Sequence, residues 1–529
     1  MKNTVIAVAA CWLVTGCAAG PDYVRPALPV TTQFAPAPLP ESTASAPVRD
    51  GAAQHFKSGM AVRADWWTLF GSPALNQLIA DALAASPTLA AAEAALHGAQ
   101  ENVLAQKGAF MPTVQANYSP SRTKIAGNLG GNSPGVQGDG SVISTGAGTP
   151  AAQGGAGPFN APVIYSFHTA QLTVGYVPDV FGGNRRQVEA LTGQARYQAL
   201  QQEAAATTLA TNLVGAAIQE ALLREQIAIT QDIVTANAQS VALLRRQQHA
   251  GFASNLDISL QEGALIQARS LLPPLTKQLE QTRNLLRALS GKAPDQELAQ
   301  TFDAASLHLP TDLPLSLPSQ VVAQRPDVRA AEAQVQVASA QAGVAAAARL
   351  PQFSIDATVG GAASHVKQMF WPSGAFFNLA GNIAQPLFDG GTLRHRQRAA
   401  EAALQQAGAQ YQATVLTAFQ NVADTLRALH ADADALNVAS AADNNARASL
   451  ALIQRQLTRG YVDRLALIGA EQAQRQAALT LAQARANRLG DTAALFQALG
   501  GGWGELDAER TRDGAAGNGA IGALSWLSK

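Results

Sequence analysis

The sequence predicts a mainly α protein with a membrane β-barrel. A duplicated set of long coiled-coil helices forms an α-barrel, and a few strands contribute to a β-barrel shared between chains. Three observations lead to this fold class: two very long helical segments, four segments of strand type and an internal repeat. Of the 529 residues 14% are charged, and Lys plus Arg equal Asp plus Glu at 37 each, so charge gives no case for a nucleic-acid partner.

The first long helix is expected from about Asn184 to Ala250, a stretch without proline that is rich in Ala, Leu, Gln and Glu. Apolar residues return every three, four or seven positions, as on one face of a helix. Such a helix has roughly 65 residues and is about 100 Å long. A second stretch of the same kind runs from about Thr392 to Arg459. Each ends at a glycine followed by an aromatic residue, Gly251-Phe252 and Gly460-Tyr461.

The N-terminus is predicted to be a lipoprotein signal peptide. A basic start precedes an apolar stretch, Thr4 to Val14, and Cys17 follows at the cleavage point. The residues before Cys17 resemble a bacterial lipobox, which implies acylation of the thiol, cleavage before the cysteine and acylation of the new amine. The alternative is a secretory signal with an incidental cysteine, but the only other cysteine, Cys11, lies in the removed segment. Several acyl chains anchor a protein firmly, and Ala18 resembles the pattern sorted to the outer membrane.

Four segments alternate between apolar and polar residues, as strands do when one face meets an apolar phase. They lie at about 113–119, 170–177, 353–359 and 377–384. Between the first two, Pro120 to about Phe167 is rich in Gly, Ser, Thr, Asn and Pro, so a long loop is expected there. A helix from Thr88 to about Ala109 precedes the first strand.

The chain contains a tandem repeat. Arg325-Pro326-Asp327 aligns with Ser86-Pro87-Thr88, and without a gap Pro351 falls opposite Pro112. The order helix, strand, loop, strand, long helix, turn and helix occurs twice, with the last helix of the first copy interrupted near Pro273-Pro274. The predicted segments are a signal peptide (1–16), a lipidated strap (17–65), a first repeat (66–291), an equatorial connector (292–318), a second repeat (319–503) and a tail (504–529).

Four strands are too few to close a membrane barrel, which needs about eight or more. An open sheet edge is not tolerated in lipid, so several chains must share one barrel. The long helices, leaving one side of it, would extend it as a tube of coiled-coil pairs. A tube joined to a pore is a conduit.

The motifs of the chain resemble those of the outer-membrane efflux factor, or TolC-like, family, and specifically its lipoprotein branch (NodT-type) that serves resistance-nodulation-division pumps. They cover about residues 17 to 503 and comprise Gly16-Cys17-Ala18 with Gly20-Pro21-Asp22-Tyr23, Trp66-Trp67, Pro178-Asp179-Val180-Phe181-Gly182-Gly183, Arg325-Pro326-Asp327, Phe388-Asp389-Gly390-Gly391 and Ala498-Leu499-Gly500-Gly501-Gly502-Trp503. The resemblance implies a homotrimer whose chains give four strands each to a twelve-stranded barrel in the outer membrane, with a helical barrel in the periplasm. It implies no cofactor beyond the covalent lipid on Cys17. The implied partners are a periplasmic adaptor (membrane fusion) protein, an inner-membrane resistance-nodulation-division transporter and outer-membrane lipid.

The resemblance also assigns candidate gate residues at the periplasmic end. Asp463 falls on a family position that forms an acidic ring, Arg459 on one that latches neighbouring helices, and Asp257 on a partner position of that latch. A second acidic position of the family is Ala466 here, which puts a double acidic ring in doubt. Without the resemblance, these residues are ordinary solvated helix ends, where Asp suits the helix dipole. We expect Asp257 and Arg459 to tether the helix tips and three copies of Asp463 to favour cations.

Two other protein classes fit parts of the sequence. A periplasmic adaptor also combines lipidation with a coiled-coil hairpin, but it should show one hairpin between β domains, and this chain has two. A lipid-anchored enzyme is the second, although the eight histidines are scattered and no His-Glu-x-x-His or phosphate-loop pattern is found. No Gly-x-Ser-x-Gly elbow is expected, because the matching stretch from Gly131 to Gly135 lies within the predicted loop and not at a turn from a strand into a helix. A soluble β-sandwich would explain the strands but not the long helices. Trp66, Trp67 and Trp503 are interpreted as packing residues of the equatorial belt.

Overall fold

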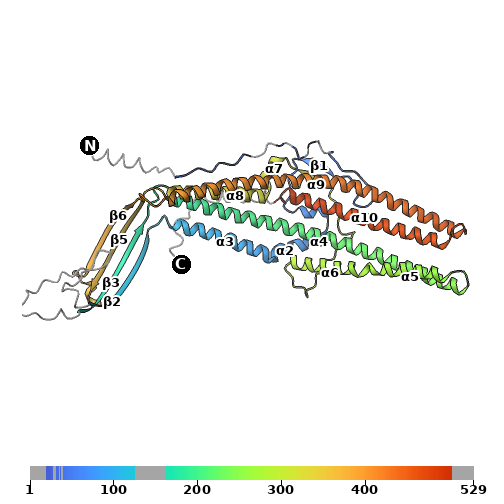
Figure 1. The fold of residues 1–529 in the computed structure, drawn as a ribbon, viewed down its shortest axis with the longest axis horizontal. Coiled ribbons are helices and arrows are strands. Elements are labelled where there is room, and N and C mark those ends of the chain that lie inside the picture. Colours follow the sequence, from blue (N-terminus) through green and yellow to red (C-terminus); the bar gives the residue numbers. More distant parts are fainter. Residues whose placement is uncertain are drawn as a thin grey trace, which may run out of the picture. The chain divides into compact units, whose positions relative to one another are not determined.

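The computed structural model describes residues 19–27, 31, 33, 34, 36, 40–125 and 163–502. They form two compact units, whose elements are labelled in Figure 1. Unit 1 comprises Met1–Val24, Ala99–Ala195 and Val335–Gln406, and unit 2 comprises Arg25–Gly98, Arg196–Gln334 and Ala407–Lys529. Each unit therefore takes segments from both predicted repeats.

Unit 1 contains an antiparallel sheet with the strand order β2-β3-β5-β6. Its strands are β2 (Thr113–Ile125), β3 (Val163–Tyr176), β5 (Gln352–Ala363) and β6 (Ala375–Ala384). Apolar residues pair across the strands on one face, as Val114 with Val174 and Phe353 with Ile383. Val114 and Ile383 are 61% and 70% exposed, so the residues that the structure describes leave this apolar face uncovered.

The two strands of the first hairpin continue into the segment predicted as a loop, so that part of the prediction was wrong. Pro120 pairs with His168, and Ile125 pairs with Val163. Backbone pairing with a partner strand does not require apolar side chains, and proline is tolerated in β2 because this strand lies at an edge of the sheet. Residues 126–162 of the predicted loop lie outside the described residues.

Both long helices are confirmed, with ends within one residue of the predicted ones: α4 (Gly183–His249) and α9 (Thr392–Thr458) have 67 residues each. An aspartate in the corner before each helix accepts hydrogen bonds from backbone N–H groups of the first helical turn. Asp179 accepts the backbone N–H of Asn184 at 2.9 Å, and Asp389 accepts that of Leu393 at 2.8 Å. These side chains satisfy N–H groups that have no partner inside the helix.

The shorter helices follow the predicted repeat. Helices α3 (Pro87–Gly108) and α8 (Pro326–Ala347) have 22 residues each. The first repeat ends with α5 (Asn255–Ser270) and α6 (Leu272–Leu289), which are separated at Leu271. This confirms the predicted interruption, because the prolines that follow Leu271 can stand only in the first turn of a new helix. The second repeat, without proline there, ends in the continuous α10 (Arg464–Ala498).

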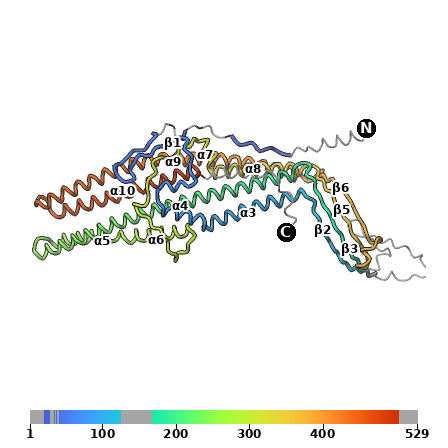
Figure 2. Tube along the Cα trace, turned by 180° about the vertical axis from the view of Figure 1, so that it is seen from behind, coloured from blue at the N-terminus to red at the C-terminus, as the bar shows by residue number. Residues whose placement is uncertain are grey.

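Figure 2 shows the tube traces of unit 2, with α9 beside α10 and α4 beside α5 and α6. No described helix is by itself long and apolar enough for a membrane span. Helix α2 (Pro73–Ala85) and α3, bent by 43° between them, meet that criterion as a pair.

A small parallel sheet in unit 2 was not predicted. Strand β1 (His55–Ser58) lies in the predicted strap and pairs with β4 (Asp312–Leu315) in the predicted connector. Each strand has four residues, which is too short for a period to appear in the sequence. The sheet attaches the strap to the folded body.

The aromatic residues after the strap pack as predicted. Trp66 begins the 3-10 helix η1 (Trp66–Phe70), is fully buried and stacks on Phe496 with ring centroids 5.1 Å apart. Trp67 is also buried. Trp503 lies outside the described residues. Farther along the same unit, α7 (Pro318–Gln324) leads into α8.

Candidate functional site

The predicted gate residues lie at two helical turns, which are at the same end of unit 2 (Figures 1 and 2). In the first turn, Gly251 has φ +81° and donates its N–H to the Gln248 carbonyl at 2.8 Å. Phe252 donates to the Gln247 carbonyl at 2.8 Å. This pair of bonds is a Schellman motif, in which a glycine with positive φ ends the helix at little steric cost.

The second turn repeats this geometry. Gly460 has φ +77° and donates to Leu457, and Tyr461 donates to Gln456, both at 3.0 Å. Phe252 and Tyr461, the residues after the two glycines, are 84% and 76% exposed. The glycine-aromatic signal in the sequence therefore marks two equivalent helix ends that present an aromatic ring to the outside of the chain.

Asp257 forms a capping box at the start of α5. Its carboxylate accepts the Ser254 backbone N–H at 2.9 Å and the Ser254 hydroxyl at 2.8 Å, and the Ser254 hydroxyl accepts the Asp257 N–H at 3.1 Å. These bonds hold the pKa of Asp257 below its usual value, first through the backbone N–H and then through the hydroxyl. Asp257 is therefore an exposed, ionised carboxylate with a structural partner already in place.

Asp463 has a different position in the second turn. It precedes α10 as the N-cap residue and accepts the backbone N–H of Ala466 at 2.8 Å. Its side chain is exposed. The negative charge stands at the positive end of the helix dipole, where it is favourable.

Arg459 follows the last residue of α9 and is also exposed. Its backbone N–H bonds to the Gln456 carbonyl at 3.1 Å. Among the residues that the structure describes, no ion pair or hydrogen bond joins its side chain to Asp257 or Asp463. The single chain thus places the three residues on two separate turns, and the predicted latch stays a prediction.

Polar contacts that the sequence analysis did not identify hold each helical hairpin together near its turn. Arg245 pairs with Glu262 across α4 and α5 at 2.6 Å, and the buried Gln261 donates to Asn237 at 2.9 Å. In the second hairpin Asp443, also buried, accepts from Gln474 at 3.4 Å and pairs with Arg447 at 2.7 Å. Counting outward from the turn glycine would not have found them, because Arg245 is six residues before Gly251 and its partner Glu262 is eleven after it. Asn237 and Gln261 deviate in the opposite direction, at fourteen and ten residues from Gly251.

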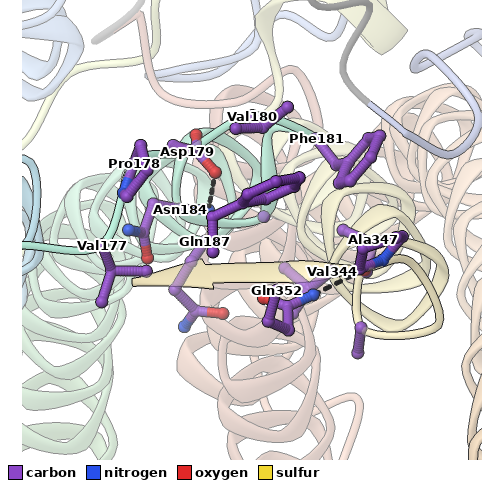
Figure 3. A pocket seen from close by; sticks show the side chains of 14 residues that line it. Val177, Pro178, Asp179, Val180, Phe181, Asn184, Gln187, Val344, Ala347 and Gln352 are labelled. Atoms are coloured by element: carbon purple, nitrogen blue, oxygen red, sulfur yellow. Dashed lines mark hydrogen bonds between the residues drawn. The ribbon is translucent and has the colours of Figure 1, made fainter. Parts of the chain in front are cut away.

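A cavity of about 320 Å³ lies in unit 1 where β3 meets α4 and α8 meets β5 (Figure 3). Apolar side chains and proline rings form most of its wall. Asp179 is the one titratable side chain among its lining residues, and it already accepts the N–H groups of Asn184 and Arg185. Gln352 donates to the Ala347 carbonyl at 3.2 Å. The wall therefore offers no free acid or base.

The start of the predicted strap is fixed to the same corner. Ala19 donates its N–H to the Phe181 carbonyl at 2.9 Å, and Asp22 pairs with the largely buried Arg186 at 2.6 Å. Between them Gly20 has φ +95°, and a Cβ there would lie 2.4 Å from the Cα of Gly343. Only glycine fits this crossing. Cys17 lies outside the described residues.

Among the described residues, no group of three or more His, Cys, Asp and Glu side chains is placed to hold a metal ion. The arrangement at the first turn uses the Ser254 hydroxyl and the Asp257 carboxylate to cap a helix. The two turns together consist of fixed charges and aromatic rings around the ends of two helical hairpins.

Comparison with known proteins gives a family match to both repeats. The sequence model of the family described as outer membrane efflux protein matches residues 78–292 and 317–501. The pyoverdine export outer membrane protein OpmQ of Pseudomonas putida is 28% identical over 439 residues, 83% of this chain and 88% of that protein. The cation efflux system protein CusC of Escherichia coli O6:H1 is 29% identical over 500 residues, 93% and 96% of the two chains.

Solved structures have the same fold. The Campylobacter jejuni CmeC outer membrane channel matches with a TM-score of 0.78 at 17% identity, over 93% of this chain and 98% of that one. The outer-membrane channel OprN matches with a TM-score of 0.76 at 24% identity, over 92% of this chain and 100% of the other.

Proposed function

The chain belongs to the outer membrane efflux protein family, and from this membership we propose that it is the outer-membrane channel of a tripartite efflux assembly. Three copies close a barrel in the outer membrane and a helical tube in the periplasm. The tube receives substrates from a periplasmic adaptor and an inner-membrane resistance-nodulation-division transporter. Family membership decides against the two rival interpretations, the adaptor itself and the lipid-anchored enzyme.

One observation carries most of this proposal. The family match falls on both repeats, and in each repeat a 67-residue helix continues directly from a paired strand. A helix of this length covers about 100 Å, and the adjoining strands expose an apolar face. Each repeat thus combines β-strands for the membrane with a long helix for the periplasm.

The proposal includes a lipid anchor on Cys17. It is supported by the lipobox resemblance and by the strap, which is bound to the β3–α4 corner from Ala19 onward. Acyl chains on Cys17 would enter the membrane beside the end of the sheet. Mass spectrometry of the membrane-extracted protein tests this part, because an unmodified Cys17 or an uncleaved leader would contradict it.

Relatives of similar identity carry unlike cargo in their names: pyoverdine, solvents and cations. Such variety is expected if the channel wall does not select substrates. In our proposal the inner-membrane transporter selects them and the channel conducts passively, with its periplasmic turns as the gate.

At the gate, Arg459 holds neighbouring helical hairpins together through Asp257, and three Asp463 carboxylates line the constriction. An attractive pair between exposed charges contributes little by itself, about 0–1 kcal/mol. Repetition in three copies and docking of an adaptor would make such weak contacts suitable for a gate that must open.

Ion conductance of the purified protein in a planar bilayer tests the channel and its gate together. We expect small, cation-preferring currents in the wild type, larger currents in Arg459→Ala and reduced cation preference in Asp463→Asn. Asparagine is chosen because it caps a helix as well as aspartate does, so the variant removes charge and keeps the cap. Arg455→Ala, an exposed arginine one turn earlier, is the matched control and should behave as the wild type.

A double-variant comparison tests the latch itself. If Arg459 pairs with Asp257, Arg459→Ala and Asp257→Asn should each raise conductance, and the double variant should raise it no further. Additive effects would contradict the pairing. A correctly folded oligomer that forms no channel in any variant would contradict the pore.

A further inference from the structure

The two faces of the sheet in unit 1 differ in polarity. Side chains alternate between the faces along each strand, and directly opposite residues of paired strands share a face. On β2, one face carries Val114, Ala116 and Tyr118, and the other carries Gln115 and Asn117. We call the apolar side the membrane face and the polar side the lumen face, because a membrane barrel turns its apolar side to lipid. The membrane face holds the even-numbered residues of β2 and β3 and the odd-numbered residues of β5 and β6.

The end of the membrane face far from the helices is positively charged. Strand β2 places Arg122 and Lys124 there, both exposed, and Arg122 lies opposite Ser166 of β3. Among the residues of the four described strands, the one acidic side chain is that of Asp356. It lies on the lumen face, opposite Gly175 and close to the helix end of the sheet. The cations and the acid are therefore at opposite ends and on opposite faces.

Strand geometry gives the level of the cations in a membrane. Tyr176, at the helix end of β3, and Ser166, opposite Arg122, are ten residues apart on the membrane face. Ten residues cover about 34 Å along a strand. With a tilt of about 40°, they rise about 26 Å along the membrane normal, and the apolar band of a barrel is about 25 Å tall. When Tyr176 is at the inner surface of the membrane, Arg122 is thus at the level of the outer head groups.

A short helical segment marks a membrane surface at the same end of the sheet. The 3-10 helix η2 (Val366–Phe370) lies over the membrane face, because a Cβ at Gly361 of β5 would collide with the carbonyl oxygen of Met369. Met369 is buried, whereas Phe370 and Trp371 are 79% and 54% exposed. Exposed aromatic residues beside an apolar band are typical of the interface between membrane and water. Gly361 is close to the outer end of β5, so this interface lies near the cations.

From these observations we propose that Arg122 and Lys124 bind phosphate groups of a glycolipid of the lipid A type in the outer leaflet of the membrane. The inference rests on the proposed membrane channel and adds a lipid partner to it. The guanidinium of Arg122 can bind a phosphate through two N–H groups, and Lys124 adds a second positive charge. The Ser166 hydroxyl, opposite Arg122, is a further donor.

The choice of face distinguishes this role from a simpler one. Charged residues on an edge strand such as β2 also prevent pairing with unrelated strands. That protection depends on the edge and requires no particular face. Here both cations are on the membrane face, while Ser121 and Thr123, which alternate with them on the lumen face, are uncharged. The position of the charges, more than their number, therefore indicates a ligand on the lipid side.

Lipid binding by the full-length, detergent-purified protein tests the proposal. Native mass spectrometry counts the lipid molecules bound per oligomer during titration with lipid A that carries two phosphates, or with the same lipid after its phosphates are removed. We expect Arg122→Gln combined with Lys124→Gln to weaken binding of the phosphorylated lipid at least about tenfold. The dephosphorylated lipid should bind this variant and the wild type alike. Lys107→Gln, at an exposed lysine of α3, is the control and should bind as the wild type.

A charge-matched variant tests the face. Ser121→Arg and Thr123→Lys are added to the double glutamine variant, which restores the net charge of the wild type but moves both cations to the lumen face. We expect binding of the phosphorylated lipid to stay as weak as in the double variant. Binding as strong as that of the wild type would overturn the assignment to the membrane face.

The mass of the oligomer and the membrane fraction that contains it are measured in the same preparations, so that two failures can be separated. A trimer from the outer membrane that binds both lipids equally would overturn the phosphate site and leave the proposed channel standing. Displacement of the lipid by inorganic phosphate at the same phosphate concentration would also overturn it, because the site would then select free phosphate. A monomer, or a protein absent from the outer membrane, would overturn the proposed channel and this inference with it.

Discussion

Helices α3 and α8 are counterparts in the repeat, with 22 residues each, yet their surroundings differ completely. Helix α8 buries Val328, Ala333 and Ala340 to 1% exposure or less, whereas α3 has no buried residue. The difference does not arise from the helix pattern, since both are rich in alanine. It arises because α8 leads into a central strand of the sheet and α3 leads into an edge strand.

The comparison of α3 with α8 suggests which surfaces of a single chain are covered when several copies assemble. A helix or corner that is bare where its counterpart is covered marks a surface that a further copy would cover. The two repeats thus serve as controls for each other, and substitutions at paired positions can separate the folding of the chain from the assembly of copies.

The largest expected effect is at the β6–α9 corner, where Phe388 is exposed. Phe388→Asp should abolish the trimer in detergent extracts, because it places a charge in an apolar contact repeated three times. The chain should still fold, since Phe388 is 93% exposed within it. Native mass measurement and circular dichroism report the two properties separately. Phe252→Asp, at an aromatic residue that is 84% exposed, is the control and should leave the trimer intact. Trimers of unchanged abundance in Phe388→Asp would mean that the corner is not covered.

At the β3–α4 corner, where Phe181 lies against Phe353, a substitution should lower the stability of the chain and not its assembly. Phe181→Ala removes the ring that contacts Phe353, so we expect it to destabilise the chain by about 1–3 kcal/mol, somewhat less than for a fully buried ring. Thermal unfolding followed by circular dichroism should show a lower midpoint. Phe388→Ala is the matched variant, and its midpoint for an isolated chain should stay close to that of the wild type. If Phe181→Ala and Phe388→Ala lowered the thermal midpoint equally, the two corners would not differ in how they stabilise the chain.

Much of this comparison could be predicted from the sequence, because long periodic segments determine their own structure. The ends of α4 and α9 and the break before Pro273 required only local signals. The outer half of β2 could not be predicted, since its residues pair through the backbone with a strand that local composition does not reveal. Strands β1 and β4 are each formed by pairing with the other, which is distant in the sequence, so neither segment alone has a sequence pattern that predicts a strand.

The candidate site shows the same division. The capping role of Asp257 could have been inferred from Ser254 three residues earlier, which is a capping-box spacing. The proposed pairing of Arg459 with Asp257 has no such local signal, because it would join two separate turns and rests on the family resemblance alone. The pair of Arg245 and Glu262 could not be found by counting either, because the two residues are not equally far from Gly251.

The helical hairpins of the two repeats also differ in their buried charges. In the first, the fully buried Glu220 pairs with Arg224 at 2.6 Å and with Arg283 at 2.7 Å. In the second, burial first and then the neighbouring carboxyl of Asp491 raise the pKa of Asp432 to about 6, which nearby Arg488 only partly opposes. In the first hairpin one carboxylate oxygen of Glu220 pairs with both arginines, while its other oxygen is buried without a partner among the described residues. In the second hairpin, burial and a neighbouring carboxyl oppose the ionisation of Asp432.

This difference predicts a pH-dependent effect of intermediate size. The folded pKa of Asp432 is raised from its usual value of 3.8 to about 6, so its contribution to stability is full below about pH 3.8 and is lost as the pH rises from there through about 6. Asp432→Asn should therefore raise the thermal midpoint by a few degrees at pH 8 and have little effect at about pH 3. Asp424→Asn, on the exposed side of the same helix, should show no such dependence. A gain at about pH 3 as large as that at pH 8 would contradict the assignment.

The smallest expected effect separates capping from gating at the two turns. Ser254→Ala removes the serine side of the capping box but keeps the charge of Asp257. Hydrogen exchange in the first turn of α5 should rise about fivefold, as for the loss of a helix cap. Conductance should stay at the wild-type level if Asp257 acts in the gate through its charge. Asp257→Asn should show the converse, with faster ion flow and a smaller change in exchange, because the amide oxygen can still accept from Ser254. If Ser254→Ala opened the channel as far as Asp257→Asn does, the carboxylate would matter to the gate only by fixing the start of α5. The first turn would then differ from the second, where Asp463 is expected to act on the ions themselves.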